Sequence, residues 1–113
     1  MKKIILFSVL ITLLSCKTQQ NQTATKKKGA ALIGFVNTAS FNEDPCSKWF
    51  DQEQKLYQTD SQTITSLKKK LKGIKIKGFL GTWCGDSRRE IPRFFKILDQ
   101  AGFKFNNLEL IAV

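Results

Sequence analysis

Residues 81–90, GTWCGDSRRE, join two segments of different periodicity and place a cysteine at their junction. The segment before them, residues 74–82, alternates apolar and basic residues and then becomes wholly apolar, which is typical of a strand that enters a buried sheet. The segment after the junction, residues 87–101, carries apolar side chains at helical spacing, and Gly102 suits its end. The sequence therefore predicts a strand that passes into a helix at Cys84.

Two further segments have the composition of strands. Residues 31–38 (ALIGFVNT) and residues 108–113 (LELIAV) are short apolar runs that contain β-branched residues, and the first run also contains a phenylalanine. Together with the helices predicted between them, they give the order strand, helices, strand, helix, strand. This order predicts an α/β fold, βαβαβ, with parallel strands joined by right-handed crossovers.

Helices are predicted between the first strand and residue 74. The first is expected to begin at Asp44 and Pro45, with the acid as N-cap and the proline at the first helical position. The second is expected to be capped by Asp60 or Ser61 and to end at Gly73, because apolar residues recur at helical spacing between these points.

The first 15 residues have the pattern of an export signal. Two lysines follow Met1, an apolar run covers residues 4–14, and Cys16 follows at once. The run has the length of a signal peptide rather than of a membrane span. Its ending, LLSC, resembles a bacterial lipobox, which implies cleavage before Cys16 and acyl chains attached to it. An ordinary secretory signal and an uncleaved anchor are the alternatives.

The segment after Cys16 has no capacity to form a core. Residues 17–28, KTQQNQTATKKK, contain no large apolar residue and no periodicity. We therefore predict a lipidated cysteine and a disordered basic tether over residues 16–30, followed by one domain over residues 31–113. A lipid-anchored protein of the bacterial cell envelope is the predicted localisation, on the periplasmic side or the surface of a membrane.

The chain is strongly basic. Its formal charge of +10 falls to +8 when Lys2 and Lys3 leave with the signal. Much of the excess lies in residues 26–28 and in the lysines of residues 68–77. These clusters suit anionic lipid headgroups or acidic polymers, but a solvated face and a solvated linker are the interpretation favoured from sequence. The export signal disfavours nucleic acid as a partner.

The predicted position of Cys84 bears on its chemistry. At the start of a helix, unpaired backbone N–H groups and the positive end of the helix dipole favour negative charge. The thiolate is the reactive form of cysteine, so this position is expected to lower the thiol pKa and to activate it. A buried structural cysteine is the alternative interpretation.

Neighbouring residues are expected to shape this site. Trp83 offers an apolar platform, and Gly85 lets a partner backbone approach. Arg88 and Arg89 are expected to add positive field, whereas Asp86 opposes it.

These residues carry a family resemblance. Residues 83–87 (WCGDS) follow an apolar strand, and Pro92 lies eight residues beyond the cysteine. This segment resembles the active site of the thioredoxin superfamily, in which a proline at this offset kinks the long active-site helix. A proline there removes the backbone hydrogen bond to the Arg88 carbonyl.

A closer resemblance is to the exported thioredoxin-like lipoproteins of the Bacteroidetes type, which are related to membrane-anchored thiol-disulfide oxidoreductases. It rests on residues 88–92 (RREIP) after the WCGDS segment and on the aromatic pair at residues 49–50, and it covers about residues 31–113. It implies a thioredoxin-like fold in which Cys84 is catalytic. The active-site neighbours implied are Trp83, Gly85, Asp86, Ser87, Arg88 and Pro92.

Two departures from the family matter. Ser87 stands where the dithiol members have their second cysteine, and a hydroxyl cannot resolve a mixed disulfide. The sequence also ends before the loop that carries the family's cis-proline. The resemblance therefore implies the N-terminal portion of the fold, without the C-terminal β-hairpin and helix, and monothiol chemistry at Cys84.

Other candidate groups are weaker. Cys46 is a possible second thiol, although a small core residue is the interpretation favoured for it. Ser87 has no histidine anywhere in the chain to activate it, so a capping role or a hydrogen bond to the Cys84 thiolate is favoured. Asp86 and Glu90 are too few for a metal site, and we expect no metal and no cofactor.

The sequence thus leaves functions of different classes open. The first is thiol-disulfide exchange or isomerisation through Cys84. Its partners would be disulfide- or thiol-bearing proteins or small thiols, and a lipid anchor would attach the protein to the membrane. The alternatives are a non-catalytic binding or envelope module with an inert Cys84, and a non-functional fragment.

Overall fold

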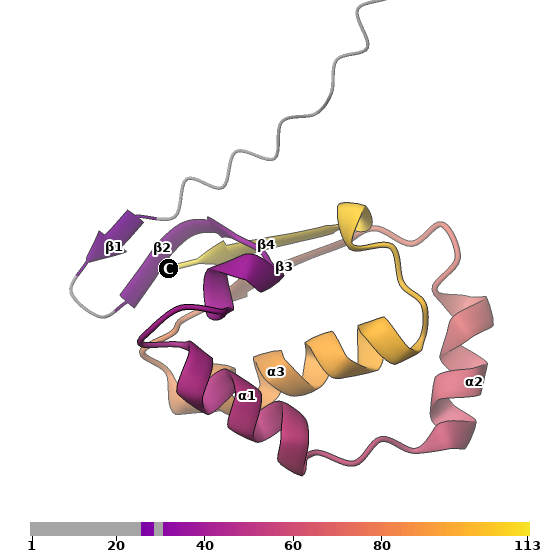
Figure 1. The fold of residues 1–113 in the computed structure, drawn as a ribbon. Helices are drawn as coiled ribbons and strands as arrows, with labels where there is room; N and C mark the ends of the chain where they lie inside the picture. Colours follow the sequence, from indigo (N-terminus) through magenta and orange to yellow (C-terminus); the bar gives the residue numbers. More distant parts are fainter. Residues whose placement is uncertain (1–25, 29–30) are drawn as a thin grey trace, which may run out of the picture.

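The computed structural model describes residues 26–28 and 31–113 (Figure 1). The predicted signal peptide, the lipidation site Cys16 and most of the predicted tether lie outside these residues. None of the helices that the structure describes combines the length and the apolar character that crossing a bilayer requires.

The described residues form an α/β structure, as predicted, and Figure 1 shows the order of its elements. The strands are β1 (Lys26–Lys28), β2 (Ala31–Val36), β3 (Ile76–Leu80) and β4 (Leu108–Ala112). The helices are α1 (Ser47–Leu56), α2 (Ser61–Lys70) and α3 (Gly85–Gln100), and the short 3-10 turns are η1 (Thr38–Phe41) and η2 (Phe105–Asn107).

The strands form one sheet in the order β1-β2-β4-β3. β3 and β4 are parallel, with Ile76 opposite Leu108, as the sequence predicted. β2, however, is antiparallel to β4, with Val36 opposite Leu110, so the prediction of an entirely parallel sheet is wrong. An apolar run has the same side-chain alternation in either direction, and the path of the intervening chain sets which one forms.

β1 is a second difference from the sequence prediction. Lys26–Lys28 pairs antiparallel with the start of β2, with Lys28 opposite Ala31, inside the range predicted to be a tether. A lysine run carries no strand signal, and the pairing is supplied by the exposed edge of β2.

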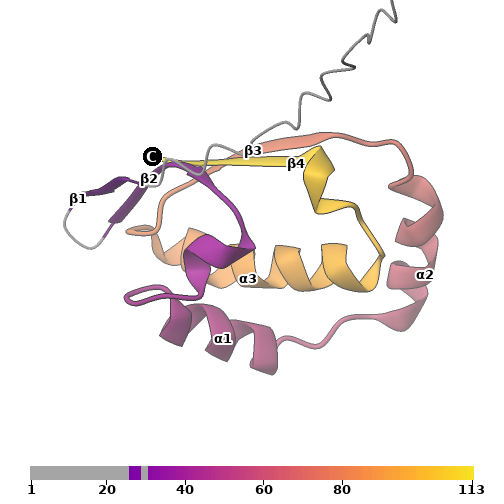
Figure 2. The same ribbon diagram turned by 45° about the horizontal axis from the view of Figure 1, so that its top comes forward.

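The helices α1 and α3 lie on one face of the sheet (Figures 1 and 2). α3 packs beneath the strands, and α1 packs on α3. The core between them centres on Phe41, which is fully buried, stacks on Phe50 at 4.9 Å between ring centroids and meets Phe95 edge-on at 5.8 Å. The other members of this core are Leu32, Val36, Cys46, Leu80, Leu110 and Ala112.

The start of α2 agrees with the sequence prediction, whereas the start of α1 differs from it. α2 begins after Asp60, whose carboxylate accepts a hydrogen bond from the Thr63 N–H at 2.8 Å, as an N-cap should. α1 begins at Ser47 rather than at Pro45, because the N–H groups of Cys46 and Ser47 bond the Glu43 carbonyl in a preceding turn. Asp44 instead accepts a hydrogen bond at 3.0 Å from the hydroxyl of Ser47, the first residue of α1.

We predict that Phe41→Ala lowers the free energy of unfolding by about 3–5 kcal/mol, because it removes the ring on which the aromatic core packs. Urea unfolding measures this change. Phe79→Ala is the matched control, because Phe79 lies on a strand with 66% of its surface exposed, and its change should stay below about 1 kcal/mol. Equal losses for the two variants would contradict this description of the core.

Candidate functional site

The candidate site lies where β3 passes into α3. Gly81 to Cys84 connect the two elements, and Cys84 is the N-cap of α3, with extended backbone at φ −87° and ψ 127°. The Cys84 carbonyl accepts the hydrogen bond from the Arg88 N–H at 3.0 Å that closes the first turn. The structure thus confirms that a strand leads into a helix at this cysteine, although α3 begins at Gly85 rather than Ser87.

Three hydrogen bonds hold the connection in place. The Gly81 N–H donates to the Ser87 hydroxyl oxygen at 3.1 Å, and the Arg88 Nε donates to the Thr82 carbonyl at 2.6 Å. The hydroxyl oxygen of Thr82, which is 2% exposed, accepts from the Leu32 N–H at 2.9 Å and so ties the connection to β2. No sequence pattern pointed to Thr82, because a single threonine in an apolar run is not distinctive.

The start of α3 lowers the pKa of the Cys84 thiol below its ordinary value. The largest cause is the backbone N–H of Ser87, followed by that of Asp86, and the Ser87 hydroxyl adds a smaller contribution in the same direction. Desolvation and the Asp86 carboxylate oppose these effects. Because Cys84 is partly exposed, a thiolate there can be reached by a reagent.

Arg88 and Arg89 are bound to other groups in the structure. Arg89 pairs with Asp86 at 3.1 Å and with Glu90 at 2.6 Å, and Arg88 is turned to the Thr82 carbonyl and to the Trp49 ring, 6.0 Å from its centroid. Neither guanidinium is among the causes of the shift at Cys84. The backbone of the helix start therefore supplies the effect.

An open hollow of about 620 Å³ lies beside the thiol. α1 forms one wall and the first turns of α3 form the other. Its lining residues are Trp49, Gln52, Glu53, Cys84, Gly85, Asp86, Arg88 and Arg89. A Cβ added at Gly85 would meet no atom within 4 Å, so there is open space in front of the first helical residue.

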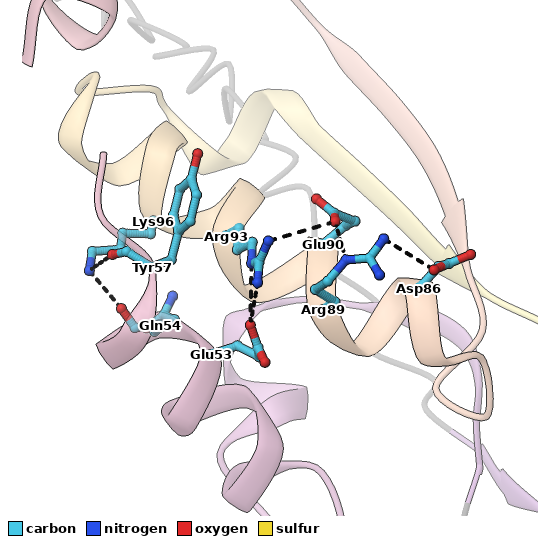
Figure 3. Close-up of polar contacts among 8 residues, drawn as sticks. All are labelled: Glu53, Gln54, Tyr57, Asp86, Arg89, Glu90, Arg93 and Lys96. Carbon is cyan, nitrogen blue, oxygen red and sulfur yellow. Dashed lines mark hydrogen bonds and ion pairs between the residues drawn. The ribbon is translucent and has the colours of Figure 1, made fainter. Parts of the chain in front are cut away.

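Polar contacts fix the two walls of this hollow relative to each other (Figure 3). Arg93 of α3 pairs with Glu53 of α1 at 3.0 Å, and Lys96 donates to the carbonyls of Gln54 and Tyr57 at the end of α1. The lysine thereby satisfies carbonyls that a helix end leaves unpaired. These contacts join the second half of α1 to the middle of α3.

The exposed ring of Trp83 covers the other side of the connection. Its indole N–H donates to the Val113 carbonyl at 2.9 Å, and the ring lies over Gly81, where an added Cβ would come within 2.7 Å of it. Gly81 is therefore needed for the close approach of this ring. Trp83 retains 66% of its surface exposed, immediately next to Cys84.

The remaining predicted residues are separated by the fold. Cys46 lies in the aromatic core, 1% exposed, and forms no disulfide with Cys84. Pro92 is buried inside α3, where its carbonyl accepts from the Gln54 amide at 3.3 Å. Within the described residues no group of three or more histidine, cysteine, aspartate or glutamate side chains is placed to hold a metal.

No family model, curated protein or solved structure matches the chain. The α/β architecture is therefore established by the structure alone. The thioredoxin-like resemblance rests on the residues around Cys84 quoted above.

We predict that Thr82→Val lowers the free energy of unfolding by about 1–3 kcal/mol, because it leaves the buried Leu32 N–H without its acceptor. Thr82→Ser keeps the hydroxyl oxygen, so its free energy of unfolding should fall by less than that of the valine variant. Urea unfolding compares the two. A valine variant as stable as the serine variant would show that this hydrogen bond does not anchor the connection.

Proposed function

We propose that the chain is an exported, thioredoxin-like protein in which Cys84 acts as a monothiol in thiol-disulfide exchange. The observation that carries this proposal is the position of the thiol. Cys84 is the N-cap residue of α3, the backbone N–H groups of Ser87 and Asp86 lower the pKa of its thiol, and the residue borders an open hollow. These are the features that make a cysteine reactive rather than inert.

The reaction that suits one thiol is exchange in two transfers. The Cys84 thiolate attacks one sulfur of a disulfide R–S–S–R′, forms the mixed disulfide Cys84–S–S–R and releases R′–S⁻. The thiolate of a second molecule then attacks the mixed disulfide, takes the R–S group and frees Cys84. The net result is isomerisation or transfer of a thiol group, with no change in the total number of disulfides.

Neither described residue that could serve as a resolving group completes a dithiol cycle with Cys84. Ser87 lies in the first turn of α3 and offers a hydroxyl rather than a thiol, while Cys46 is buried in the core at the start of α1. The serine nevertheless has a use, because its hydroxyl contributes to the lowered pKa and its oxygen binds the Gly81 N–H.

The alkylation of Cys84 tests the first part of this proposal. Because the folded-state pKa of the thiol is lowered, the rate of alkylation by iodoacetamide should reach half its maximum at a pH below the free-thiol value of about 8.5. Mass spectrometry of the full chain reads Cys84 separately from Cys46, which serves as the buried internal control. A midpoint at or above about 8.5 would favour the alternative, a non-catalytic module with an inert cysteine.

A Ser87→Cys variant tests the monothiol character. The natural chain, incubated with a disulfide such as oxidised glutathione, should accumulate a mixed disulfide at Cys84, because Ser87 is not a thiol and Cys46 is buried. The variant should release glutathione and form an internal disulfide, since it restores a thiol three residues on. If the natural chain accumulates no adduct under conditions where the variant reacts, monothiol exchange is wrong.

A further inference from the structure

The hollow described above has two carboxylates in its lining, and arginines of the chain already bind both (Figure 3). Glu53 pairs with Arg93 at 3.0 Å. Asp86 pairs at 3.1 Å with Arg89, a residue that also binds Glu90. A cationic ligand would have to compete with these guanidinium groups, so the lining carboxylates do not favour one.

Arg88 differs from the other charged residues of this lining. Its side chain is exposed and forms no ion pair with a described residue. The Nε–H donates to the Thr82 carbonyl at 2.6 Å, and the guanidinium carbon lies 6.0 Å from the centroid of the Trp49 ring. These contacts orient the guanidinium and leave the N–H groups of both terminal nitrogens without a hydrogen bond to a described residue. A fork of such donors matches the geometry of a carboxylate.

Arg88 also lies near the reactive sulfur. Its backbone N–H donates to the Cys84 carbonyl at 3.0 Å, which places the two residues one helical turn apart. Residues at this spacing have their Cβ atoms about 5–6 Å apart on one face of a helix. A molecule that binds Arg88 through a carboxylate therefore needs only a short carbon chain to bring a sulfur to Cys84.

The size of the hollow favours a small molecule. Its volume of about 620 Å³ falls within the range of about 300–1,000 Å³ that is typical of small-molecule sites. Trp49 on the α1 wall offers an apolar surface to the carbon chain that joins a carboxylate to a sulfur. Both walls belong to α1 and to the first turns of α3.

Resting on the exchange reaction proposed above, we propose that Cys84 reacts preferentially with low-molecular-weight disulfides whose thiol halves carry a carboxylate. Arg88 binds the carboxylate of the half under attack, and Trp49 contacts its carbon chain. The Cys84 thiolate forms a bond to the nearer sulfur, the original S–S bond breaks, and its electron pair leaves on the other carboxylated thiolate. The number of disulfides is unchanged, so the step needs no further oxidant or reductant.

Three small disulfides of similar length test the proposal on the full chain. Dithiodipropionate ends in carboxylates, dithiodiethanol in hydroxyls and cystamine in ammonium groups. Mass spectrometry measures the initial rate at which each forms a mixed disulfide at Cys84. Because the three reagents differ in intrinsic reactivity, the ratio of the dithiodipropionate rate to the dithiodiethanol rate is compared between variants. We expect Arg88→Gln to lower this ratio by about threefold or more, and Arg88→Lys, which keeps the charge, to lower it less.

A matched control separates a local contact from the net charge of the chain. Lys72→Gln removes the same charge from an exposed position before β3, whereas Cys84 follows the other end of that strand. The ratio in this variant should equal that of the natural chain. Losing the contact of Arg88 with Thr82 can change the connection, but this would slow all three reagents together and leave the ratio unchanged. Urea unfolding verifies that each variant is folded.

The outcomes distinguish this proposal from the function on which it rests. A natural chain that forms no adduct at Cys84 with any of the three disulfides would overturn both. Adducts with all three, at a ratio that is the same in Arg88→Gln as in the natural chain, would overturn the preference for carboxylates alone. An equal fall of the ratio in Lys72→Gln would also overturn it, because the preference would then come from net charge. A cystamine rate that rises relative to dithiodiethanol in Arg88→Gln, as the dithiodipropionate rate falls, would support the proposal.

Discussion

The candidate site depends on the short connection between β3 and α3. Only Gly81 to Cys84 separate the two elements, so the backbone has to turn from strand to helix within four residues. Three hydrogen bonds hold this turn. The Thr82 hydroxyl accepts a hydrogen bond from the Leu32 N–H, and the Arg88 side chain donates one to the Thr82 carbonyl. The Ser87 hydroxyl accepts the third from the Gly81 N–H. These contacts hold the connection that leads into the first turn of α3, whose Asp86 and Ser87 N–H groups lower the pKa of the Cys84 thiol.

Much of this arrangement is encoded locally and was predictable. The change from strand to helical periodicity around Cys84 marks the junction, Asp60 caps α2, and Gly102, with φ of +69°, ends α3 where the pattern indicated. The favourable position of Cys84 follows from the same pattern, since any side chain at a helix start meets unpaired N–H groups.

What the sequence did not predict depends on contacts between distant segments. The antiparallel pairing of β2 with β4 is set by the path of the chain between them, and the strand at Lys26–Lys28 forms only because β2 offers an edge. Thr82 acquires its role from Leu32, 50 residues away. Nor did the sequence indicate that Arg88 binds the Thr82 carbonyl or that Arg89 pairs with the carboxylates of Asp86 and Glu90.

The central claim is that backbone N–H groups of α3 lower the pKa of the Cys84 thiol and so favour its thiolate form. Nuclear magnetic resonance measures it directly, because the carbon-13 shift of the Cys84 Cβ reports deprotonation while the nitrogen-15 and proton shifts of the Asp86 and Ser87 amides report the hydrogen bonds. We predict that all three residues titrate together, with one pKa below about 8.5. A Cβ that titrates at or above this value, with amides that do not respond, would contradict the account.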